Sequence, residues 1–95
     1  MLERFYDLSE QAQVNFVGFA TEKARYDFAI VYTNHFFGKP LVICMQTNHS
    51  SLLDADDLTN LTYLQQTFHL KLEEAMELSE FLYARMPILS ARDQY

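Results

Sequence analysis

Hydrophobic and polar positions alternate along the first half of the chain and recur with a helical period along the second half. Runs of aromatic and β-branched residues with period-two alternation predict three strands, at residues 14–21, 26–33 and 41–47. Apolar residues spaced three and four apart predict two helices, at residues 54–68 and 72–86. The polar connections between the strands are short, so the strands are expected to pair antiparallel. The predicted fold class is α+β: a three-stranded antiparallel sheet followed by two helices packed on one face.

The two predicted helices differ in their polar signals. Asp54 is placed to cap the first helix, and residues 69–71 break the helical pattern before the second helix. The second helix has a broad apolar arc with glutamates opposite it, which is typical of a helix that packs on a core. Phe81 is the exception, because the same periodicity places it among the glutamates. Phe81 is therefore a candidate contact residue.

Neither face of the predicted sheet is fully polar. Because two helices cover only one face, the other face is expected to meet a partner, and apolar patches of this kind are rarely left bare. Self-association, with a homodimer favoured, is the first expectation, and an unidentified protein partner is a further one. The alternative is that the apolar residues of the N-terminal segment, Leu2, Phe5, Tyr6 and Leu8, fold over this face. The candidate interface residues are Val17, Phe19, Ala29, Val31, Val42, Phe36, Phe37 and Phe81.

Size and charge exclude several classes of protein. A chain of 95 residues, 49% of them hydrophobic, is expected to form one domain over residues 1–95. The formal net charge of -6 and the scattered basic residues argue against nucleic acid as a partner. No stretch is long and apolar enough to predict a membrane span, and the N-terminus does not resemble a signal peptide. The single cysteine, Cys44, fits a reducing compartment, so a cytoplasmic location is expected.

A repeated tripeptide raises the question of a polar site. Thr-Asn-His occurs at residues 33–35 and again at 47–49, on either side of the third predicted strand. A strand of seven residues separates its ends by roughly 23 Å, so His35 and His49 cannot share one metal ion within a single chain. A site formed between subunits stays open, with His35 or His49 and the polar groups of Asn34, Asn48 and Tyr32. No catalytic motif, metal motif or cofactor motif is present, so no cofactor is expected.

Three segments carry a resemblance to a known family: VNFVGF at residues 14–19, FFGKPLVIC at 36–44 and ELSEFL at 77–82. In these segments the chain resembles a small Firmicute family of uncharacterised cytosolic proteins, which is classed as a domain of unknown function. The resemblance implies a cytosolic protein with no assigned activity. It supplies no catalytic residues to carry over.

Two functional hypotheses follow. The first is a non-enzymatic, self-associating interaction or regulatory module that uses the second sheet face. The alternative is a small-ligand or metal-binding enzyme whose site forms between subunits around the two histidines.

Overall fold

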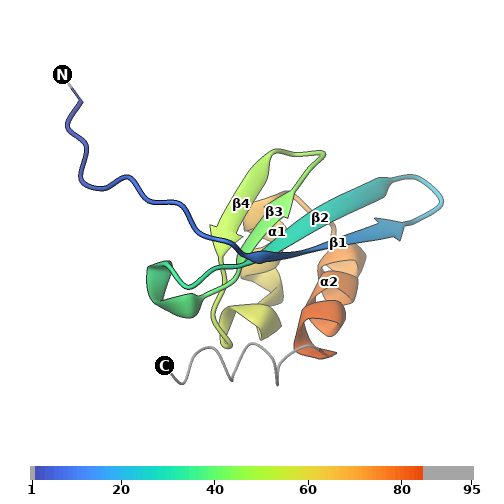
Figure 1. Cartoon of the computed structure of the whole chain (residues 1–95). Helices are drawn as coiled ribbons and strands as arrows, with labels where there is room; N and C mark the ends of the chain where they lie inside the picture. Colours follow the sequence, from blue (N-terminus) through green and yellow to red (C-terminus); the bar gives the residue numbers. More distant parts are fainter. Residues whose placement is uncertain (1, 85–95) are drawn as a thin grey trace.

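A computed structural model describes residues 2–84 of the chain, shown in Figure 1. Four strands come first: β1 (Gln13–Ala20), β2 (Arg25–Tyr32), β3 (Leu41–Cys44) and β4 (His49–Leu52). Two α-helices follow, α1 (Leu61–Phe68) and α2 (Leu72–Ala84), with short 3-10 turns at Phe36–Gly38 and Asp57–Thr59. The α+β class, the antiparallel sheet and the two following helices are confirmed. The strand number is corrected from three to four.

The sheet has the order β1-β2-β3-β4, and every neighbouring pair is antiparallel. The third predicted strand was too long, because the ordered strand ends at Cys44 and the chain then turns. Asn48 closes that turn in the left-handed region, at φ 61°, and its N–H donates to the Cys44 carbonyl at 2.9 Å. Asn tolerates this conformation better than most residues. The turn joins β3 to β4, the strand that was not predicted from the sequence.

The first helix begins at Leu61, later than predicted. Asp54 does not cap it: its N–H donates to the Asp57 carboxylate at 3.0 Å, and the Asp57 N–H donates back to the Asp54 carboxylate at 2.9 Å. This reciprocal pair stabilises a tight turn ahead of the helix. The cap is Asn60, whose side-chain oxygen accepts from the Tyr63 N–H at 3.1 Å.

The predicted break between the helices is confirmed at His69, which is left-handed at φ 57° and ends α1. The N–H of Leu70 then donates to the Gln65 carbonyl at 3.0 Å, which completes a helix-ending motif. Helix α2 begins at Leu72 as predicted. The predicted last two residues of this helix, 85 and 86, lie outside the described residues.

Both helices pack on one face of the sheet, as Figure 1 shows. The core lies between them and the even-numbered residues of β2 and β3, of which Phe28, Ile30 and Val42 are at most 1% exposed. Helix α2 contributes a narrow stripe of buried residues, Ala75, Leu78 and Leu82. No helix in residues 2–84 is long and apolar enough to cross a membrane.

Candidate functional site on the open face of the sheet

The sheet face opposite the helices is called the open face here. The ladder partners place residues from all four strands on it. The residues on or beside the open face are Val14, Phe16, Gly18, Ala20, Arg25, Asp27, Ala29, Val31, Leu41, Ile43, Met45, Ser50 and Leu52. Phe16 is 74% exposed, Met45 51% and Val14 43%. The open face therefore presents large apolar groups to solvent on its β1 side.

A polar cluster interrupts this apolar surface at Asp27. Its carboxylate accepts from the Gln46 side-chain amide at 2.7 Å and from Arg25 at 3.2 Å. The Asp27 N–H in turn donates to the Gln46 side-chain oxygen at 2.6 Å. The hydrogen bond from Gln46, followed by that from Arg25, lowers the pKa of Asp27 below its ordinary value. The carboxylate is thus held in one position while it remains ionised.

Gly18 lies directly across the β1–β2 ladder from Asp27. A β-carbon at position 18 would stand 2.9 Å from the Asp27 Oδ1 atom, which is closer than normal contact allows. Beside Gly18 the surface is hollowed by about 500 Å³, with Phe16, Arg25, Asp27 and Met45 among the lining residues. The missing side chain and the fixed carboxylate shape this hollow. We call it the Gly18 hollow.

The N-terminal segment leaves the β1 side of the open face uncovered, although Tyr6 and Leu8 line a hollow with Val31 and Leu41. Leu2 and Phe5 are 98% and 92% exposed, and Tyr6 and Leu8 are 57% and 51% exposed. The alternative in which these four residues fold over the sheet therefore does not hold for Leu2 and Phe5, while Tyr6 and Leu8 lie beside only Val31 and Leu41 of the open face. Figure 1 shows the segment running away from the sheet ahead of β1.

The segment contacts the rest of the structure where it approaches the end of β2. The Glu10 carboxylate accepts hydrogen bonds from the Thr33 hydroxyl and, at 3.2 Å, from the Asn34 N–H. The ring of Tyr6 lies 4.9 Å from that of His35. These contacts are at the end of β2, so the β1 side of the open face stays uncovered.

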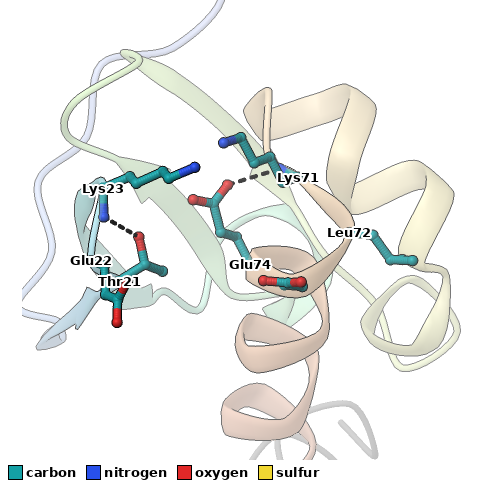
Figure 2. A pocket seen from close by; sticks show the side chains of 7 residues that line it. Thr21, Glu22, Lys23, Lys71, Leu72 and Glu74 are labelled. Atoms are coloured by element: carbon teal, nitrogen blue, oxygen red, sulfur yellow. Dashed lines mark hydrogen bonds between the residues drawn. The ribbon is translucent and has the colours of Figure 1, made fainter.

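A separate cleft of about 590 Å³ lies between the β1–β2 turn and the start of α2. Figure 2 shows Lys23 and Lys71 on either side of it, with Glu74 between them. Glu74 accepts from the Lys71 N–H at 2.8 Å and so caps the start of α2. Glu22 and Glu73 also line the cleft, so its charges are mixed and favour neither an anion nor a cation.

Tyr26 lies near the same cleft. Partial burial, followed by the charge of Glu74 and a hydrogen bond to it, raises the pKa of Tyr26 above its ordinary value. Glu74 therefore links the start of α2 to β2. This is a structural link between the two layers of the fold.

The two Thr-Asn-His tripeptides lie at opposite ends of β3. His49 is the ladder partner of Cys44, the last residue of β3, whereas His35 precedes the turn that leads into β3. The ring of His49 instead stacks on that of His69, with centroids 4.2 Å apart and planes at 17°. The sequence pattern did not predict this pair, because His69 comes from the break between the helices. Within residues 2–84, no three His, Cys, Asp or Glu side chains are placed to hold a metal ion.

The other residues considered for that polar site have structural contacts. The Asn34 N–H donates to Glu10, and Asn48 forms the β3–β4 turn. Tyr32 is 6% exposed and belongs to the core. The N–H of His35 donates to the Thr33 hydroxyl at 3.0 Å, and its ring lies 4.3 Å from that of Phe36.

The candidate interface residues lie on both faces of the sheet, in the turn before β3 and on α2. Ala29 and Val31 are on the open face, but Val17, Phe19 and Val42 are on the face that the helices cover. Phe36 and Phe37 form a left-handed turn with Gly38, and Phe37 is 93% exposed. The open-face residues that the prediction omitted include Val14 and Phe16 on β1 and Leu41 and Ile43 on β3.

The predicted position of Phe81 among the glutamates of the second helix is wrong. Phe81 does not project among the glutamates of α2, because its ring packs against that of Phe19 at a centroid distance of 5.8 Å. It is partly buried against the core. Its place on the core side of α2 follows from the rotation of the helix, whose buried stripe is narrower than the predicted apolar arc.

A simple signal could have separated the two faces. Ladder partners on β1 and β2 have residue numbers that sum to an odd value, as in Val17 with Phe28. A four-residue connection between Ala20 and Arg25 imposes this pairing. Odd-numbered residues of β1 therefore share a face with even-numbered residues of β2. Val17 and Phe19 could not lie on the same face as Ala29 and Val31.

Fold and surface define a small α+β protein with one helix-covered sheet face and one open, largely apolar face. A family model covers residues 5–84, which is most of the chain. The chain belongs to the SAV0927-like family, a family of unknown function. The expected family of unknown function is thereby confirmed, while a Firmicute origin stays a prediction. No curated protein matches the sequence.

Proposed function

We propose that the protein is a non-enzymatic module that self-associates through the β1 side of its open face. One observation carries the proposal: Phe16 is 74% exposed on the face opposite the helices, on the β1 side that the N-terminal segment leaves uncovered. A Phe side chain contributes a large apolar area when buried, so a contact at this position provides a strong driving force for association.

The shape and charge of the surrounding surface support a second copy of the chain as the partner. With a net charge of -6, two copies repel each other wherever their acidic surfaces meet. Strand β1 has no charged residue, and the charge of Asp27 beside it is paired with Arg25. This side of the open face is therefore a place where two copies can approach without like charges in contact.

A cytoplasmic location is part of the proposal. Cys44 is a free thiol in the core and 0% exposed. A protein that keeps its single cysteine as a buried thiol is suited to a reducing compartment.

Sedimentation velocity of the wild type, Phe16→Ser and Phe37→Ser tests the proposal. The matched control removes an even more exposed Phe, 93% against 74%, but from the turn before β3. We expect Phe16→Ser to sediment as a monomer at concentrations where the wild type and Phe37→Ser are dimers. Equal association by all three proteins would refute a contact at Phe16.

A further inference from the structure

The outer edge of β1 is unusually open to pairing. Edge strands are normally protected by charged residues, proline, a bulge or short length. β1 has eight residues, Gln13–Ala20, with no charge and no proline, and its ladder with β2 runs without interruption. The opposite edge, β4, has only four residues, His49–Leu52.

The hydrogen bonds of Asp27 reveal which backbone groups face outward along this edge. Its N–H donates to the Gln46 side chain, and its carbonyl accepts from the Met45 N–H at 2.8 Å. Both groups therefore point toward β3, so Asp27 and its ladder partner Gly18 form a non-hydrogen-bonded pair. It follows that the N–H and carbonyl of Gly18 point away from β2.

Outward-pointing groups recur at every second residue of a strand. The residues whose N–H and carbonyl groups face outward are Val14, Phe16, Gly18 and Ala20. In an antiparallel ladder between two copies, these four residues must pair with one another. A two-fold axis at Val17 meets this requirement, because it pairs Phe16 with Gly18 of the second copy and Val14 with Ala20.

We propose that two copies pair through antiparallel β1 edges centred on Val17, so that their sheets join into one eight-stranded sheet. The inference rests on the proposed self-association and specifies its geometry. The pairing places each Phe16 across from Gly18 of the other copy, beside the Gly18 hollow. Gly18 has no side chain that would collide with the Phe16 ring. An aromatic ring across from a strand glycine covers the exposed backbone of that glycine.

The lining of the hollow suits an aromatic ring. Met45 provides a polarisable sulfur, and the guanidinium of Arg25 can lie near the ring while it stays paired with Asp27. Centres at Asn15, Phe16, Gly18 and Phe19 also pair outward-facing residues, but none of them places Phe16 across from Gly18. A centre at Phe16 would place the two Phe16 side chains directly opposite each other and leave the hollow beside Gly18 unfilled. The centre at Val17 fills both hollows.

Cysteine cross-linking tests the register. At the two-fold centre, Val17 of one chain lies opposite Val17 of the second chain in a non-hydrogen-bonded pair. The Cα atoms of such a pair are about 4.5 Å apart, which is within the range for a disulfide. Under mild oxidation we expect Val17→Cys to form a covalent dimer. Asn15→Cys is the matched control: it lies on the same strand and the same face, but the two copies of residue 15 are four residue steps apart. The native Cys44 is 0% exposed and therefore does not form an intermolecular disulfide itself.

Amide exchange of the wild-type protein tests the same geometry without a substitution. We expect the N–H groups of Phe16 and Gly18 to exchange at least about 10-fold more slowly at concentrations that favour the dimer than after dilution to the monomer. The amide of Phe37, which lies in the turn before β3, is the internal control.

The outcomes separate the two proposals. A dimer in which Val17→Cys cross-links, Asn15→Cys does not, and both amides are protected supports the shared sheet. A dimer with unprotected Phe16 and Gly18 amides would overturn the edge pairing but leave self-association standing. A protein that stays monomeric at every concentration would overturn both, and would leave the edge open to a strand from a different protein.

Discussion

Gly18 and Asp27 face each other across the β1–β2 ladder, so closely that any side chain at position 18 would meet the Asp27 carboxylate. The carboxylate cannot easily move aside, because Gln46 and Arg25 both hold it. This pair of residues thus keeps the Gly18 hollow open and fixes the position of Asp27, the only acidic residue of strands β1 and β2.

Gly18→Ala should therefore lower the melting temperature. At an ordinary strand position the same substitution stabilises a protein by about 0.5–1 kcal/mol, because Gly loses more backbone entropy on folding. We expect this ordinary gain to return in an Asp27→Ala background, where the carboxylate is absent. Thermal or denaturant unfolding of the wild type, the two single variants and the double variant shows whether the effect of Gly18→Ala on stability changes sign. A loss of stability in both backgrounds would mean that Asp27 is not the obstacle.

The lowered pKa of Asp27 predicts a dependence of stability on pH. Its folded pKa lies below the unfolded value, so its contribution is present above the unfolded pKa, about 3.9, and is lost as the pH falls through the folded pKa. Gln46→Ala should raise the pKa of Asp27, which carboxyl NMR titration would show. The stability difference between this variant and the wild type should shrink in acid.

Gln66→Ala is the control for that experiment, since Gln66 is exposed on α1 and distant in sequence from the cluster. It should leave the titration of Asp27 unchanged. An unchanged Asp27 titration in Gln46→Ala would contradict the assigned role of Gln46.

Glu74 has two separable roles, as an acceptor for the Lys71 N–H and as a charge near Tyr26. Glu74→Ala removes both and should cost about 1 kcal/mol of stability, which is typical for the loss of a helix cap. Glu74→Gln keeps an acceptor but removes the charge, so it should retain most of the stability while the pKa of Tyr26 falls. Denaturant unfolding and ultraviolet titration of the tyrosines measure the two effects.

Glu73→Ala serves as the comparison for Glu74, because it also removes a carboxylate from the first turn of α2. It should lower stability less and leave Tyr26 unaffected. If Glu73→Ala and Glu74→Ala were equally destabilising, the cap would have no special importance.

His69 ends α1 in a left-handed conformation, which disfavours every residue with a β-carbon. His69→Gly and His69→Ala both lose the stacking on His49, but only His69→Gly removes the strain of a β-carbon in the left-handed conformation. We expect the Gly variant to be more stable than the Ala variant by about 1 kcal/mol in denaturant unfolding. Equal stabilities would show that the left-handed conformation at residue 69 is not maintained in solution.

The sequence predicted the fold class because the long strands and the second helix have strong, regular patterns. The sequence pattern did not indicate β4, because His49, Ser50 and Ser51 are polar and none of the side chains of this short edge strand is fully buried. Asn48, which takes the left-handed conformation of the turn, was the available signal for a β3–β4 hairpin. The start of α1 was misplaced because Asp54 and Asp57 bond to each other, an arrangement that looks like a cap in sequence.

The candidate site was only partly accessible from sequence. Alternation showed that both sheet faces are apolar, but which residues share a face depends on the register between strands. Phe81 was misassigned because the rotation of α2 depends on its packing against Phe19, which the helical period alone does not determine. The His49–His69 stack depends on tertiary packing between β4 and the end of α1.

Native mass spectrometry of the untagged wild-type protein over a range of concentrations is the most direct test of the central claim. It reports the number of chains and any bound mass in one spectrum. We predict a dimer of bare chains that gives way to monomer on dilution. A monomer at every concentration would contradict self-association through the open face.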